Sequence, residues 1–90
     1  MESVQRQLTV VNPCGLHGRA SARLVEAARR FRANLTLCRG GQEADCRSIL
    51  EVMGLACAQG TVVSLRGEGE DAQEAVEALS ALMEDGFGER

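Results

Sequence analysis

An imidazole and a guanidinium lie close together near the start of the chain, and groups of these two types at this spacing could carry out phosphoryl chemistry. His17 is the only histidine among the 90 residues, and Arg19 follows it two positions later. The apolar spacing after His17 predicts a helix, and a helix start offers unpaired N–H groups and a positive dipole end that favour a phosphate. The same dipole disfavours a protonated imidazole, so the neutral, nucleophilic ring is available near neutral pH.

A phosphorylated His17 would find its partners within the first turn of that helix. The backbone N–H groups of Gly18 and Arg19 can donate to phosphoryl oxygens, and the Arg19 side chain can balance the added charge. His17 would then be a covalent relay, because it accepts a phosphoryl group and passes it on. The alternative is that His17 is only a polar residue at a helix start.

The cysteine pattern disfavours other kinds of site. The four cysteines are widely and irregularly spaced and follow no secretion signal, so we expect free and mostly buried thiols at Cys14, Cys38, Cys46 and Cys57. Cys14 and His17 form a single C-x-x-H pair, but two ligands do not make a zinc site. We therefore expect neither a metal site nor a cofactor.

Strands and helices alternate along the chain and must position these residues. Alternating apolar residues predict strands at 4–11, 34–39, 42–46 and 61–66, and helical spacing predicts helices at about 18–31, 48–54 and 71–86. The order β-α-β-β-α-β-α predicts an α+β open-faced β-sandwich, in which three helices cover one face of a four-stranded antiparallel sheet. We expect residues 1–90 to form a single domain of this kind.

Two of the predicted helices begin with a capping pair. Ser48 is followed three residues later by Glu51, and Asp71 is followed by Glu74. In such a pair the first side chain accepts a hydrogen bond from a free backbone N–H of the helix start.

The distribution of charge favours a protein partner. The net charge is −3, all ten basic residues are arginines, five of these lie between residues 19 and 32, and acidic residues gather from Glu68 to Glu89. A positive region of this kind suits docking on an acidic protein surface. The absence of Trp and Tyr argues against nucleic acid, and no apolar run is long enough for membrane insertion, so we expect a cytoplasmic protein.

The segment GLHGRASARLVEAARRF, residues 15–31, closely resembles the active-site segment of HPr, the phosphocarrier of the bacterial phosphoenolpyruvate-dependent phosphotransferase system. Residues 47–88 resemble the second half of the same family, so the resemblance covers nearly the whole chain. It implies the open-faced sandwich fold. It also implies that enzyme I phosphorylates His17 on Nδ1, that Arg19 is the active-site arginine, and that an enzyme IIA histidine receives the phosphoryl group.

The resemblance also implies a regulatory serine and a docking patch. Ser48 matches the serine that an ATP-dependent HPr kinase/phosphorylase modifies in many members, and this role is compatible with helix capping. Arg23, one helical turn beyond Arg19, would belong to the partner-binding surface or to a solvated helix face. The residues that match the family's hydrophobic docking patch, two of which could simply be core, are Ile49, Leu50, Met53 and Leu55.

Two positions depart from the usual family pattern. Ala20 stands where most members have proline, and Gly18 stands where alanine is usual. Because alanine is a good helix former, we expect function to be retained. The R-A-S-A version is similar to proteobacterial members, including the nitrogen-related branch, which favours a regulatory role over bulk sugar uptake.

Two functions remain open at this stage. One is a monomeric phosphocarrier that is a component of a phosphotransferase system rather than a stand-alone enzyme. The other is an HPr-like regulatory module that acts through protein contacts, with control by phosphorylation of Ser48. The intact run Gly15-Leu16-His17 followed by Arg19 favours the carrier, but the sequence does not separate sugar uptake from nitrogen or carbon regulation.

Overall fold

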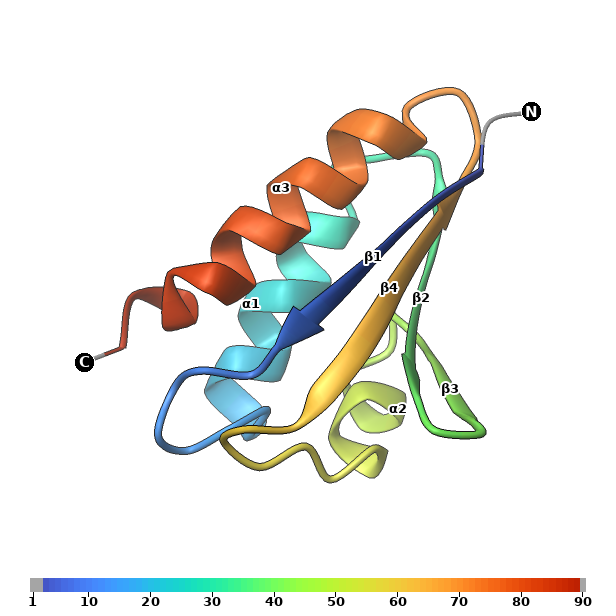
Figure 1. Ribbon diagram of the computed structural model, residues 1–90. Coiled ribbons are helices and arrows are strands. Elements are labelled where there is room, and N and C mark those ends of the chain that lie inside the picture. Colours follow the sequence, from blue (N-terminus) through green and yellow to red (C-terminus); the bar gives the residue numbers. More distant parts are fainter. Residues whose placement is uncertain (1–2, 90) are drawn as a thin grey trace.

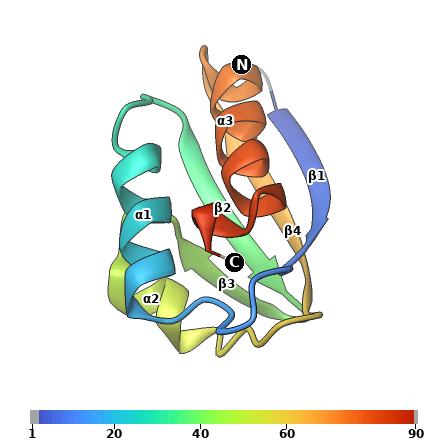
Figure 2. The same cartoon turned by 90° about the vertical axis from the view of Figure 1, so that its left-hand side faces the viewer.

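The computed structural model describes residues 3–89 and contains one four-stranded sheet. In chain order the elements are β1 (Ser3–Thr9), α1 (Gly18–Ala28), β2 (Asn34–Arg39), β3 (Gln42–Asp45), α2 (Ile49–Gly54), β4 (Val62–Glu68), α3 (Ala72–Glu84) and the 3₁₀ turn η1 (Gly86–Gly88). The three helices lie on one face of the sheet and leave the other face open (Figures 1 and 2). The predicted α+β open-faced sandwich and its element order are confirmed.

The strands lie in the order β1-β4-β2-β3, and every neighbouring pair is antiparallel. Val63 of β4 is opposite Leu8 of β1, and Leu65 of β4 is opposite Leu37 of β2. Successive strand residues point to opposite faces, so these apolar side chains share the face that the helices cover. All four are buried, whereas Val62 and Ser64 lie on the open face.

The helices complete the core with one apolar stripe each. Leu24 of α1 and Leu79 and Met83 of α3 are fully buried, and burial of each such side chain stabilises the fold by about 1.5–3 kcal/mol. Gly67 lets α3 lie close to β4, because a Cβ at this position would be only 2.7 Å from Cγ2 of Val76. No helix within residues 3–89 is both long and apolar enough to cross a lipid bilayer.

The element ends differ from the prediction by a few residues. α1 ends at Ala28 rather than near Phe31, because the N–H groups of Arg30 and Phe31 donate to carbonyls only three residues back. Such tighter bonds are common in the last turn of a helix. The ends of β1, β3 and β4 differ from the predicted ends by one or two residues.

The two predicted capping pairs have different outcomes. Ser48 caps α2, since its Oγ accepts a hydrogen bond from the Glu51 N–H at 3.2 Å. The prediction for Asp71 is wrong, because its side chain makes no capping bond to α3. Its two carboxylate oxygens instead accept the N–H groups of Arg32 and Ala33, each at 2.8 Å, and tie the α1–β2 connection to the start of α3.

Candidate functional site

His17 is itself the N-cap residue of α1. Its backbone is extended, with φ −74° and ψ −178°, and its Nδ1 accepts a hydrogen bond from the Arg19 N–H at 3.2 Å. The imidazole therefore does what a serine or aspartate side chain usually does at a helix start. A ring nitrogen that accepts a hydrogen bond carries no proton, so the proton of the neutral ring is on Nε2.

The loop before His17 is held rigidly against the loop between α2 and β4. Gly15 has φ +66°, and a Cβ there would lie 2.2 Å from the Cys57 carbonyl oxygen, so only glycine fits. The Leu16 N–H donates to the same carbonyl at 2.8 Å, and the Leu16 side chain is buried. Buried Asn12 adds a hydrogen bond to the Gly15 carbonyl at 2.7 Å. These contacts fix where the imidazole lies.

The C-terminal tail supplies the second partner of the imidazole. The chain turns from the end of α3 towards α1 (Figure 2), and Glu89 Oε2 lies 2.8 Å from Nε2 of His17. The other oxygen, Oε1, accepts a hydrogen bond from Nδ2 of Asn12 at 3.1 Å. Neither Asn12 nor Glu89 was among the predicted site residues, because no local pattern signals a contact across 72 positions.

Glu89 presents a negative charge to the imidazole. The hydrogen bond from Asn12 lowers the pKa of the Glu89 carboxyl, partial burial opposes this, and the contact with His17 and the charge of Arg23 lower it further. The carboxylate is thus ionised at neutral pH. An ionised partner accepts a proton from Nε2 strongly and supports a positive charge that develops on the ring.

Arg19 and Arg23 lie on the exposed side of α1 but differ in their contacts. The Arg19 side chain is exposed in the first turn, and none of the ion pairs found within residues 3–89 involves it. Arg23, one turn further, donates from its guanidinium to the Phe87 carbonyl and so holds the tail. The structure leaves the Arg19 guanidinium available to an anion bound beside His17.

The short helix α2 packs beside α1 and presents an apolar surface (Figure 2). Its exposed residues include Leu50, at 83% exposure, together with Ile49 and Met53. Leu55 is only 3% exposed and belongs to the core, so the prediction of a partner-binding side chain at this position is wrong. A short helix must bury one side, and Leu55 with Val52 forms that side. Ser48 is partly exposed at the start of the helix.

The cysteines do not contribute a second site. All four are free, and burial raises the pKa of the Cys46 thiol to about 12 and also raises that of Cys57. Cys38 is half-buried and Cys14 is exposed, so the prediction of mostly buried thiols holds for two of the four. Within residues 3–89, no three histidine, cysteine, aspartate or glutamate side chains gather as a metal site would require.

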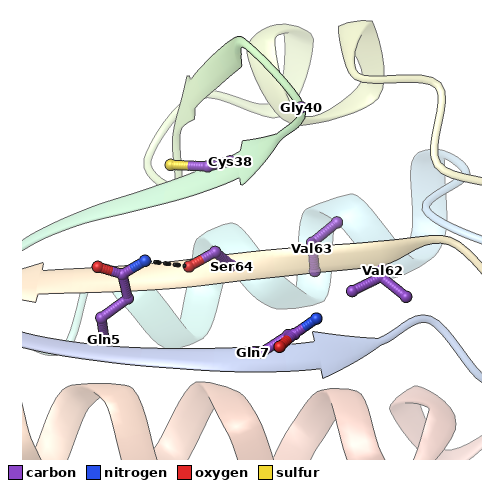
Figure 3. Close-up of a pocket in the computed structure, with 7 residues that line it drawn as sticks. All are labelled: Gln5, Gln7, Cys38, Gly40, Val62, Val63 and Ser64. Atoms are coloured by element: carbon purple, nitrogen blue, oxygen red, sulfur yellow. Dashed lines mark hydrogen bonds between the residues drawn. The ribbon is translucent and has the colours of Figure 1, made fainter.

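The open face of the sheet has a hollow of its own, and His17 is not among the residues that line it (Figure 3). It has a volume of about 560 Å³ and is wide open to solvent. Its residues come from β1, β2, β4 and the β2–β3 turn, and Gln5 donates to the Ser64 hydroxyl at 2.7 Å across it. Of the described residues that line the hollow, only Cys38 has a titratable side chain.

Comparison with known proteins agrees with this geometry. The family model described as "PTS HPr component phosphorylation site" matches residues 4–85. The chain is 46% identical to "Phosphocarrier protein HPr" of Xylella fastidiosa, over 96% of this chain and 97% of that protein. It is 36% identical to "Phosphocarrier protein NPr" of Shewanella violacea, over 99% and 98% of the two chains.

The chain is also similar to the solved structure of "HPr-C-His" from Thermoanaerobacter tengcongensis. The TM-score is 0.91 at 36% sequence identity, and the match covers 100% of this chain and 99% of that one. The fold and the sequence comparisons therefore agree. The chain belongs to the HPr family of phosphotransferase-system phosphocarrier proteins.

Proposed function

We propose that His17 accepts a phosphoryl group on Nδ1 from phosphorylated enzyme I, ultimately from phosphoenolpyruvate, and passes it to a histidine of an enzyme IIA domain. The observation that carries this proposal is the hydrogen bond from the Arg19 N–H to Nδ1, because a nitrogen that accepts a hydrogen bond carries no proton and so has the electron pair that a nucleophile needs. That nitrogen lies at the start of α1, where N–H groups favour phosphate.

The transfer is a nucleophilic displacement at phosphorus. The Nδ1 electron pair forms the new N–P bond, the bond from phosphorus to the donor breaks, and its electron pair returns to the donor. The Arg19 N–H then loses Nδ1 as its acceptor and, with the Gly18 N–H, is available to the phosphoryl oxygens. The exposed Arg19 guanidinium neutralises part of the added charge. In the transfer to enzyme IIA, a nitrogen of the acceptor histidine forms the new N–P bond, the Nδ1–P bond breaks, and its electron pair returns to Nδ1.

The partners would dock on the surface around His17. Exposed apolar residues on α2 support this, because Ile49, Leu50 and Met53 are exposed on a helix that packs against α1. Arg19 and Arg23 add positive charge to the same side of the molecule, which suits an acidic partner. The proposed reaction needs one copy of the chain and takes place in the cytoplasm.

Whether the protein serves sugar uptake or regulation depends on which enzyme I and which enzyme IIA it meets. Named relatives include both HPr and NPr proteins, so sugar uptake and nitrogen or carbon regulation both have support. The second candidate, a regulatory module controlled through Ser48, is favoured by one observation. Ser48 is partly exposed beside the apolar residues of α2, where a phosphate would change the docking surface.

The deciding experiment is intact-mass spectrometry after incubation with phosphoenolpyruvate, magnesium and purified enzyme I, with His17→Ala as the control. Enzyme I from the sugar branch and from the nitrogen branch are used in parallel. We expect one acid-labile phosphoryl group on the wild type and none on the variant, and the faster enzyme identifies the branch. No label with either enzyme would reject the carrier and leave the regulatory module.

A further inference from the structure

The backbone of the tail after α3 has an unusual run of left-handed residues. Gly86, Phe87 and Gly88 are three successive residues in the left-handed region, with φ values of +65°, +59° and +74°. Glycine adopts this region freely, but a phenylalanine there is strained and must be held by its surroundings. Phe87 is 1% exposed, so its burial in the core holds the turn in place.

Two hydrogen bonds lock this turn and direct the residue that follows it. The Glu89 N–H donates to the Gly86 carbonyl at 2.9 Å, and Arg23 donates to the Phe87 carbonyl. The turn thereby places Glu89 at the start of α1, where its side chain is 18% exposed. A strained turn that ends on a partly buried charged group points to a role for that group.

The Glu89 carboxylate has one defined orientation, because each oxygen has its own donor. Oε1 accepts from Asn12 at 3.1 Å, and Asn12 is anchored in turn to the Gly15 carbonyl at 2.7 Å. Oε2 faces Nε2 of His17 at 2.8 Å. The ring is therefore held from both sides, by the Arg19 N–H at Nδ1 and by Glu89 at Nε2.

We propose that Glu89 is a positioning residue for phosphoryl acceptance by His17. Its carboxylate keeps the proton on Nε2 and covers that nitrogen, so Nδ1 is the unprotonated nitrogen, and its electron pair becomes available for attack when the Arg19 N–H moves from Nδ1 to a phosphoryl oxygen. When Nδ1 forms the N–P bond, Nε2 keeps its proton and the ring becomes positive, and the Glu89 charge stabilises that product. This inference rests on the proposed function of His17 and adds a residue from the far end of the chain.

The first test uses phosphoramidate, a small chemical donor that needs no partner protein. Its phosphorus is attacked by a ring nitrogen, the bond to nitrogen in the reagent breaks, and ammonia leaves. We expect wild type to give only the Nδ1 isomer by ³¹P NMR, and Glu89→Ala to give a mixture with the Nε2 isomer. Glu74→Gln, which removes an exposed charge on α3, should match wild type. An unchanged Nδ1-only product in Glu89→Ala would overturn the proposal.

The second test measures the enzyme-catalysed reaction. Glu89→Gln keeps the size of the side chain and removes its charge, so phosphorylation by enzyme I should fall about tenfold in kcat with little change in KM. A Gly88→Val substitution should have a similar effect, because a β-branched residue does not fit the left-handed turn that delivers Glu89. Wild-type rates in both variants would overturn the proposal.

The two tests separate this inference from the proposed function. If wild type accepts no phosphoryl group from either enzyme I but phosphoramidate gives the predicted isomers, the carrier function fails and the positioning role at Nε2 stands. If enzyme I phosphorylates wild type, Glu89→Gln and Gly88→Val alike, the carrier function stands and the role of Glu89 is refuted.

Discussion

At the scale of single residues, the chemistry of His17 depends on what each ring nitrogen contacts. Nδ1 accepts the Arg19 N–H at 3.2 Å, and Nε2 faces the Glu89 carboxylate at 2.8 Å. A histidine in water exchanges between tautomers and rotamers, whereas the two contacts of this ring favour the tautomer with its proton on Nε2 and hold the ring in one orientation. The side chain of Arg19 is exposed, and in the proposed reaction it meets an anion only when a phosphoryl group is present.

The substitution Arg19→Ala should therefore slow transfer without affecting the fold. A charged hydrogen bond to the phosphoryl group is lost, so phosphorylation by enzyme I and transfer to enzyme IIA should each slow about tenfold. The free energy of unfolding should change by less than about 0.5 kcal/mol, because the side chain is exposed. Rapid-quench kinetics and thermal unfolding check both values. Arg29→Ala is the matched control, and equal transfer rates in the two variants would contradict the role of Arg19.

At the scale of elements, α2 combines a structural cap with an exposed apolar surface. Ser48 accepts the Glu51 N–H at 3.2 Å, and the Glu51 side chain accepts the Asp45 N–H at 3.0 Å, so the helix start is tied to the end of β3. The residues that follow include the highly exposed Leu50. A charge at position 48 would thus alter the docking surface without removing the cap.

Ser48→Asp and Ser48→Asn separate these two effects. Both side chains are good N-caps, so both variants should unfold at nearly the temperature of wild type. Only aspartate adds a negative charge beside the apolar residues of α2, so only this variant should accept phosphate from enzyme I more slowly, by about tenfold. Steady-state phosphorylation with enzyme I as the varied partner measures the effect. A similar loss in the asparagine variant would mean that side-chain shape, and not charge, is responsible.

At the scale of the whole molecule, Asp71 joins segments that are distant in sequence. Its oxygens accept the N–H groups of Arg32 and Ala33, which link the α1–β2 connection to the beginning of α3. The bonds from Arg32 and Ala33 lower the pKa of the Asp71 carboxyl, while desolvation partly opposes them. A carboxyl whose pKa is lower in the folded state stabilises the fold above its unfolded pKa of about 3.9, and this contribution disappears as the pH falls through the folded value.

The substitution Asp71→Asn should consequently lower the melting temperature at neutral pH. The amide has one acceptor oxygen, so its NH₂ group would face one of the two backbone N–H donors. The difference from wild type should shrink as the pH falls below the ordinary aspartate pKa, because wild type then loses the ionised form too. Melting curves at a series of pH values check this, with exposed Glu74→Gln as the control. A difference that stays constant down to low pH would show that the carboxylate charge is not involved.

Local physics was enough to predict much of the fold and the centre of the site. Hydrophobic periodicity acts over a few neighbouring residues, so the strands, the helices and their order could be read from the sequence. The position of His17 before α1 and the cap at Ser48 are also local, because a helix end needs a partner within about three residues. These features depend on separations of one helical turn or less.

Only the tertiary structure decided the contacts between distant segments. The sequence pattern did not distinguish buried Leu55 from exposed Leu50, and it assigned Asp71 to the wrong partners. The approach of Glu89 to His17 depends on the packing of α3 and on the left-handed turn anchored by Phe87. Contacts of this kind follow from how the helices and the sheet pack as a whole, which no local pattern encodes. The sequence by itself determined a histidine at a helix start, and the packed chain determined which of its two nitrogens accepts the Arg19 N–H and which faces Glu89.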